Sequence, residues 1–219
     1  MAEEPEPSEG LDLAFQYPSV AVQRDTDRLG MWMFLATEVM MFGAVFMALT
    51  VYRTIHPAAM RAAAAHLHLA IGAANTAILL AGSALVALAE GAALAGRRRE
   101  AAWELGAAAL MGVLFVALKM TEWYLEYTEG LMPGISPRFA LPQPAERLFF
   151  DLYYLATGLH ALHLTVGVLL IGGLALRIAV GRLPVPERGA VVGLAGLYWQ
   201  FVDVVWIFLF PVLYLASPR

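Results

Sequence analysis

The chain has 219 residues, of which 60% are hydrophobic and only 15% charged, and its mean hydropathy is +0.67. Soluble domains carry more charge than this, so the composition predicts one integral membrane domain. The absence of cysteine excludes disulfides, thiolate metal sites, iron–sulfur clusters and covalently attached c-type haem, and the net charge of -4 argues against a nucleic-acid partner.

Residues 1–28 are predicted to form an acidic cytoplasmic tail, because their start is rich in glutamate and lacks the basic region and apolar core of a signal peptide. Residues 29–219 form the membrane domain, in which each hydrophobic segment is long enough to cross a bilayer. The predicted segments are residues 29–52, 66–95, 103–127, 149–176 and 191–216. The predicted fold class is all-α, an integral membrane bundle of five transmembrane helices.

Arginine residues predict the orientation of this bundle. Eight arginines lie on the side of the N-terminus and five on the opposite side. Because cytoplasmic loops carry the excess of basic residues, we expect a cytoplasmic N-terminus and an external C-terminus. Basic residues at the membrane edge also attract anionic lipid headgroups, and the candidates for that role are Arg61, Arg97, Arg98 and Arg99.

Glu38 lies well inside the first segment, in the sequence FLATEVMMF. An ionisable group at that depth is costly in a bilayer, so it is a functional-site hypothesis by default. Two interpretations stay open: a buried carboxyl that takes part in proton chemistry, or a neutral carboxyl that hydrogen-bonds a neighbouring helix. Asn75 and Thr76 in the second segment are more typical of a hydrogen bond between helices.

The third segment places Lys119, Glu122 and Glu126 on one helix face, so Lys119 can pair with Glu122. Aromatic residues surround this end of the segment, as at a membrane interface. We therefore expect Glu126 to extend to the lipid headgroups and Glu122 to have the buried role.

The fourth segment places His160 and His163 on one face with Thr157. Imidazoles so placed are candidates for metal ligands, members of a proton relay or partners of a carboxyl group. A metal would need more ligands, from Glu38 or Glu122, and nothing in the sequence fixes that geometry, so a metal site is disfavoured.

A haem would need axial histidines on facing helices. His66 and His68 lie at the edge of the second segment, too shallow to face the histidines of the fourth, so haem is also disfavoured. The fifth segment adds one more buried ionisable group, Asp203, within the sequence YWQFVDVVW.

Three of these motifs together resemble subunit III of the haem–copper cytochrome c oxidases. They are FLATEVMMF at residues 34–42, ATGLHALH at 156–163 and YWQFVDVVW at 198–206. The similarity extends over residues 30–214 and so covers nearly the whole chain. Gln200 departs from the family pattern, which usually has histidine at that position.

The resemblance implies a short, five-helix form of the subunit, without the two extra N-terminal helices of longer members, in a bacterial inner (plasma) membrane. It implies no catalytic residue, metal or cofactor in this chain, because haem and copper lie in the catalytic subunit I. The chain would support assembly, phospholipid binding and proton uptake during aerobic electron transport. The buried polar residues tied to that role are Glu38, Glu122, His160, His163 and Asp203.

Three alternatives stay open at the level of sequence. The chain could belong to a quinol oxidase or a nitric oxide reductase complex, because the family has relatives there. It could also be a haem-binding membrane anchor, or a small proton-coupled carrier that uses its buried carboxyls and histidines. The family motifs favour the oxidase subunit, whose partners are subunit I, the other oxidase subunits and membrane lipids.

Overall fold

A computed structural model of the chain describes residues 17–136 and 143–215, and these residues contain helices and no strand. The helices are α1 (Val20–Ile55), α2 (Pro57–Ala64), α3 (Leu69–Leu94), α4 (Arg98–Thr128), α5 (Pro144–Ala179) and α6 (Gly189–Tyr214). All but α2 are long and apolar enough to cross a membrane, which confirms the predicted all-α architecture with five spans. The chain is therefore a multi-pass integral membrane protein.

Several helices extend beyond the predicted hydrophobic segments. The helix α1 begins at Val20, because the Ser19 hydroxyl accepts a hydrogen bond from the Val22 amide at 3.3 Å and caps the helix. Residues 20–28, which we expected to be part of a tail, are thus helical. The acidic segment at residues 1–16 and the predicted end of the last span at 216 lie outside the described residues.

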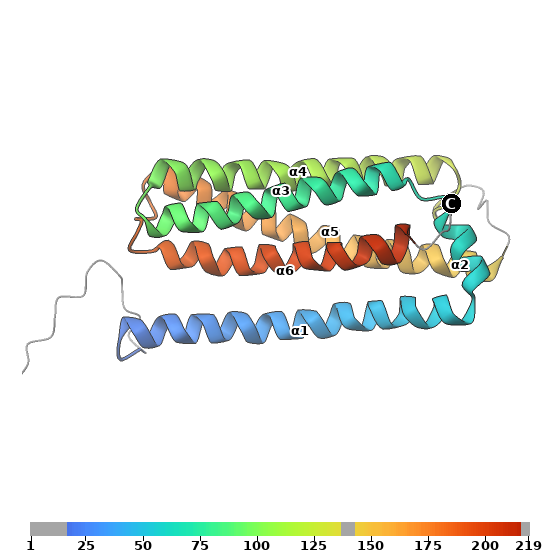
Figure 1. Cartoon of the computed structure of the whole chain (residues 1–219), viewed down its shortest axis with the longest axis horizontal. Coiled ribbons are helices and arrows are strands. Elements are labelled where there is room, and N and C mark those ends of the chain that lie inside the picture. The colour runs from blue at the N-terminus through green and yellow to red at the C-terminus, as the bar shows by residue number, and fades with distance from the viewer. Residues whose placement is uncertain (1–16, 137–142, 216–219) are drawn as a thin grey trace, which may run out of the picture.

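The sequence pattern did not predict the short helix α2. Its first residue is Pro57, which suits the first turn of a helix because proline has a fixed φ and no N–H to satisfy there. Met60, Ala63 and Ala64 are buried, and α2 packs on α5 at the end of the bundle where α1 ends (Figure 1).

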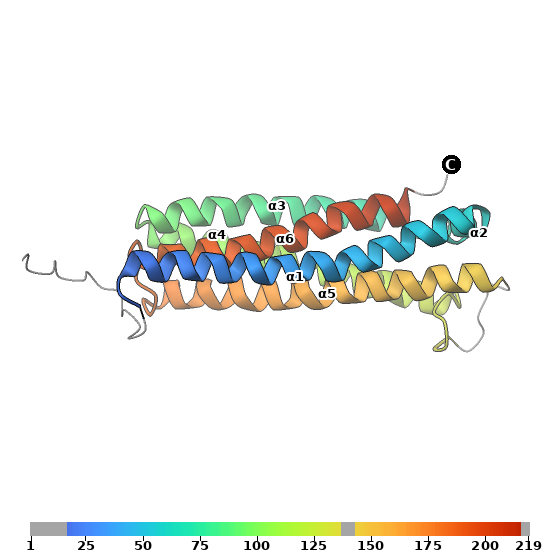
Figure 2. The same cartoon turned by 90° about the horizontal axis from the view of Figure 1, so that it is seen from below.

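Four long helices, α3 to α6, pack together, and α1 lies at the edge of this group. In Figure 1, α1 lies below α6, at the bottom of the bundle. In Figure 2 it passes in front of α5 and α6, the two long helices that it contacts. Only 17% of the most apolar part of α1 is buried inside the chain, against 33–44% for the other long helices. Much of α1 is therefore free to face lipid or another protein.

Glycine allows the closest approach between the packed helices. A Cβ atom on Gly112 of α4 would lie 2.4 Å from Val168 Cγ2 of α5 and 2.8 Å from Trp199 Cη2 of α6. Gly72 of α3 likewise has no room for a side chain, because Phe210 Cε2 would lie 2.9 Å from its Cβ. Small residues therefore set the spacing of the bundle, as is common where helices pack in lipid.

Candidate functional site

Glu38 of α1 contacts His163 of α5, with Glu38 Oε2 and His163 Nε2 3.0 Å apart. The other ring nitrogen, Nδ1, lies 2.8 Å from the Leu159 carbonyl oxygen. A carbonyl only accepts, so Nδ1 carries a hydrogen and donates it. One proton then lies between Nε2 and Oε2, either on a carboxylic acid that donates to neutral imidazole or on an imidazolium that donates to carboxylate. The pair is neutral overall in both cases.

This pair is mostly buried and joins α1 to the rest of the bundle. The Glu38 and His163 side chains are 15% and 14% exposed. Phe42 packs edge-on against the His163 ring, with the ring centroids 5.3 Å apart. The Tyr198 hydroxyl of α6 donates to the His163 carbonyl oxygen at 3.0 Å, so three helices meet at this contact.

A second polar group, which we name the Lys119 cluster, lies in the interior between α4, α5 and α6. It consists of Lys119, Glu122, Glu126, Tyr153, Tyr154 and Tyr214. Lys119 Nζ donates to Glu122 Oε2 at 2.9 Å, to the Tyr153 hydroxyl at 2.8 Å and to the Tyr214 hydroxyl at 2.7 Å. All three hydrogens of the ammonium group are therefore used.

The cluster corrects one expectation and supports another. Glu122 is buried and ion-paired with Lys119, as its helical spacing indicated. Glu126 does not extend to the headgroups, because it is also fully buried. Its two carboxyl oxygens accept hydrogen bonds from the Tyr153 hydroxyl at 2.7 Å and the Tyr154 hydroxyl at 2.8 Å.

The structure separates the two histidines of the ATGLHALH motif. His163 faces α1, whereas His160 is fully buried and packs against Phe115 of α4 and Trp206 of α6. Neither His160 nitrogen has a hydrogen-bond partner within the described residues. The Thr157 hydroxyl donates to the carbonyl oxygen of Tyr153 in its own helix and so does not link the histidines.

Asp203 of α6 is buried and faces α3. The Ser83 hydroxyl donates to Asp203 Oδ2 at 2.7 Å, and Oδ1 has no partner in the described part of the chain. Two turns before Ser83 in α3, the Thr76 hydroxyl accepts from Trp206 Nε1 at 3.0 Å. The expected hydrogen bond between helices is therefore present at Thr76, whereas the buried side chain of Asn75 has no partner in the described part of the chain.

The predicted site residues thus fall into separate contacts, two of them between helices and one within α4. Glu38 meets His163, Glu122 meets Lys119, and Asp203 meets Ser83. Sequence reasoning missed the three tyrosines of the Lys119 cluster. The adjacent Tyr153 and Tyr154, shortly before the histidine motif, were the one feature that could have pointed to them. Within residues 17–136 and 143–215, no three His, Asp or Glu side chains gather as metal ligands would.

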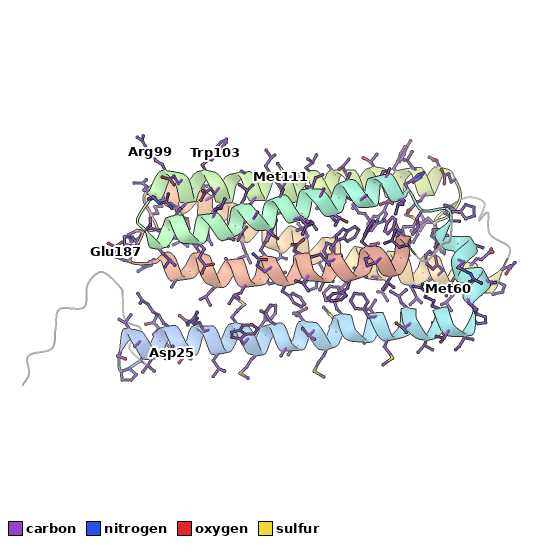
Figure 3. All side chains as sticks on the ribbon, viewed as in Figure 1. Asp25, Met60, Arg99, Trp103, Met111 and Glu187 are labelled. Atoms are coloured by element: carbon purple, nitrogen blue, oxygen red, sulfur yellow. The ribbon has the colours of Figure 1, made fainter. Side chains whose placement is uncertain are left out.

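The basic residues proposed for lipid contact differ in surroundings. Arg98 donates from Nε to the Ile178 carbonyl at 2.7 Å and from Nη2 to the Ala179 carbonyl at 2.6 Å, and so satisfies the C-terminal end of α5. Arg97 pairs with Glu100. Arg99, in the first turn of α4, extends away from the bundle (Figure 3).

Two hollows lie beside the N-terminal half of α1. A cavity of about 760 Å³ lies between α1, α3 and α6, and Arg24, Arg28, Glu90 and Gln200 are among its lining residues. A groove of about 500 Å³ lies between α1, α5 and α6, with mostly apolar lining and Arg177 at its edge. Asp25 and Glu187, which also line the cavity, lie at the same end of the molecule in Figure 3.

Comparison with known proteins gives consistent matches. The family described as cytochrome c oxidase subunit III matches residues 16–217. The cytochrome c oxidase subunit 3 of Thermostichus vulcanus is 29% identical over 207 residues, which cover 94% of this chain and 92% of that protein. The heme-copper oxidase subunit I+III of Aeropyrum pernix is 32% identical over 200 residues, which cover 88% of this chain and 23% of that longer protein. The cytochrome bo(3) ubiquinol oxidase subunit 3 of Pseudomonas aeruginosa is 29% identical over 188 residues, which cover 86% of this chain and 84% of that protein.

Proposed function

Because this chain belongs to the cytochrome c oxidase subunit III family, we propose that it is the non-catalytic subunit III of a haem–copper terminal oxidase. In this role it supports assembly of the oxygen-reducing core and its proton uptake in aerobic electron transport. The observation that carries the proposal is the family match over residues 16–217, which spans every described helix. Haem and copper belong to the partner subunit in this proposal.

The partner that we propose is the catalytic subunit I. The fusion of subunits I and III in the relative from Aeropyrum pernix supports this assignment, because two proteins that are joined in one chain usually act together. The exposed apolar side of α1 is available for a neighbour of this kind, since little of that helix is covered within the chain.

The buried polar residues have two proposed roles, which are helix packing and support of proton movement. Glu38 and His163 share one proton at the α1–α5 contact, as their hydrogen bonds require. Glu122, His160 and Asp203 lie in the interior, where ionisable groups are rare unless they are paired or used. Their positions within membrane-spanning helices support a role near a proton path in the assembled enzyme.

We also propose that the subunit binds phospholipid. The groove beside α1 offers an apolar lining for an acyl chain, with Arg177 at its edge for a phosphate. Arg61 and Arg99 are exposed and suited to anionic headgroups. Arg97 and Arg98 make contacts within the protein, so they contribute less to lipid binding than Arg61 and Arg99.

The orientation is proposed from charge. The basic residues near the N-terminal end of α1 and at the α3–α4 connection lie at the same end of the bundle, and we place this end in the cytoplasm. The membrane is then the bacterial inner (plasma) membrane, with the C-terminal end of α6 toward the outside.

A second candidate is a subunit of a quinol oxidase. The similarity to the subunit 3 of a bo(3) ubiquinol oxidase favours it nearly as well as the cytochrome c oxidase matches favour the first. The two candidates differ in the electron donor, which other subunits select. Identification of the polypeptides that accompany this chain distinguishes them.

Purification of the native complex by a tag on this chain tests the proposal. We expect the chain to copurify with a haem–copper catalytic subunit that carries all the haem of the preparation. A chain that purifies without an oxidase core, or that shows a Soret band by itself, would contradict the proposal and favour the haem-anchor alternative.

A further inference from the structure

The hydrogen bonds of the Lys119 cluster connect two buried carboxyl groups. Tyr153 lies beside Glu126 at 2.7 Å, and Tyr214 lies beside both oxygens of Glu122 at 2.9 Å. The hydroxyl oxygens of Tyr153 and Tyr214 are 3.4 Å apart, and Lys119 Nζ contacts both. A chain of hydroxyl groups therefore runs from Glu126 through the two tyrosines to Glu122.

The charges of the cluster do not balance when every group has its usual form. One ammonium and two carboxylates carry a net charge of minus one, and Lys119, Glu122 and Glu126 all have side chains that are essentially inaccessible to water. An uncompensated charge in such a place is strongly disfavoured. One more proton makes the cluster neutral.

The charged and titratable groups around the cluster do not supply that charge. From α4 come Lys119, Glu122 and Glu126, from α5 Tyr153 and Tyr154, and from α6 Tyr214. At its margins lie Glu129, which is acidic, and His160, which is wholly buried between aromatic rings. From α3, Gly72 packs against the Tyr214 ring and brings no charge.

We propose that the Lys119 cluster binds one exchangeable proton, which Glu122 and Glu126 share through the hydroxyls of Tyr153 and Tyr214. In one form the Glu126 acid donates to the Tyr153 oxygen, Tyr153 donates to Tyr214, and Tyr214 donates to the Glu122 carboxylate. In the other form the Glu122 acid donates to Tyr214, Tyr214 to Tyr153, and Tyr153 to the Glu126 carboxylate.

The transfer between these forms conserves atoms and charge. The Glu126 proton moves to the Tyr153 oxygen, the Tyr153 proton moves to the Tyr214 oxygen, and the Tyr214 proton moves to Glu122. Three O–H bonds break, three form, and nothing is oxidised or reduced. The 3.4 Å between the tyrosine oxygens exceeds the usual length of an O–H···O bond, so the transfer requires these two groups to approach. Tyr154, which is only partly buried, is the member of the cluster nearest to the outside.

Infrared difference spectroscopy of the complex tests the proton count through the C=O stretch of protonated carboxyl groups. Glu122→Gln and Glu126→Gln should each remove one protonated carboxyl equivalent, because the remaining carboxylate then balances Lys119 without the extra proton. Lys119→Met should add one equivalent, since both carboxyl groups must then be neutral. The matched control Glu129→Gln, at the exposed C-cap position just after α4, should leave the protonated-carboxyl signal unchanged.

Two results would overturn the proposal. If neither glutamine variant loses the signal, the cluster is anionic. If only one of them does, the carboxyl that remains in the other variant stays protonated beside Lys119, and charge balance does not set the proton count. Tyr153→Phe tests the sharing itself, and it also provides a test if the glutamine variants fail to assemble. It should keep the number of protonated carboxyls and shift their frequency, because it removes a hydrogen-bond partner, and an unshifted signal would contradict the shared path.

The proton count depends on the fold alone, whereas its use during oxygen reduction rests on the proposed function. Copurification with the catalytic subunit is scored separately from the infrared signal. A chain that carries the shared proton but has no oxidase partner would therefore refute the proposed function and leave this inference standing.

Discussion

Replacing Glu38 by leucine would remove the polar contact that joins α1 to α5. His163 Nδ1 is committed to the Leu159 carbonyl, so Nε2 would lose its partner Glu38. A buried polar atom without a partner costs about 1–3 kcal/mol. Because the two side chains are 15% and 14% exposed, water can partly replace the lost group. We therefore expect a loss of about 1–2 kcal/mol, roughly a five- to thirtyfold shift in the folded ratio.

A double-mutant cycle measures this contact directly. The variants Glu38→Leu, His163→Leu and the combination of both are compared by equilibrium unfolding in detergent, and we expect a coupling of about 1–2 kcal/mol between the two sites. Glu38→Gln is the matched control, because its amide keeps a similar volume and can donate to Nε2, and it should lose little stability. A coupling near zero, or a leucine variant more stable than the original chain, would refute the reasoning.

The remaining predictions concern packing, topology and lipid. Gly112→Val should destabilise the bundle by about 1–3 kcal/mol through overlap with α5 and α6, whereas Gly106→Val on an open face of the same helix should cost far less; equal unfolding midpoints would contradict this. Arg99→Cys should react with impermeant thiol reagents only from the cytoplasmic face and Arg61→Cys only from outside, and the reverse pattern would invert the topology. Mass spectrometry of gently purified complex should detect retained phospholipid, and its absence would count against the lipid role.

Hydrophobic length predicted the number of membrane spans, because each crossing requires a long apolar segment whatever its neighbours are. It did not predict the helix boundaries, because a helix can extend past its apolar segment into polar residues. The helix α1, for example, begins at Val20, where the Ser19 side chain caps its first turn. The sequence also did not predict which side chains of different helices are in contact. Glu126 looked like an interfacial residue because the tyrosines that bury it, Tyr153 and Tyr154, come from the next helix.

Helical geometry explains a subtler limit. His160 and His163 lie three residues apart, which offsets their directions by about 60° around the helix axis. The offset is small enough that the sequence pattern places both histidines on one helix face. It is large enough for His163 to contact α1 while His160 packs among α4 and α6, once neighbours occupy both sides. Only the arrangement of the other helices decides between these outcomes.

Deletion of this chain from the native enzyme is the most direct test of the account, which holds that the chain assists proton uptake without a redox centre of its own. The absorption spectrum of the remaining core and its sustained turnover are measured on the same preparation. We predict a haem spectrum that is nearly unchanged, together with lower turnover or slower proton uptake. A core that has lost one haem, or one that turns over and takes up protons as before, would contradict the account.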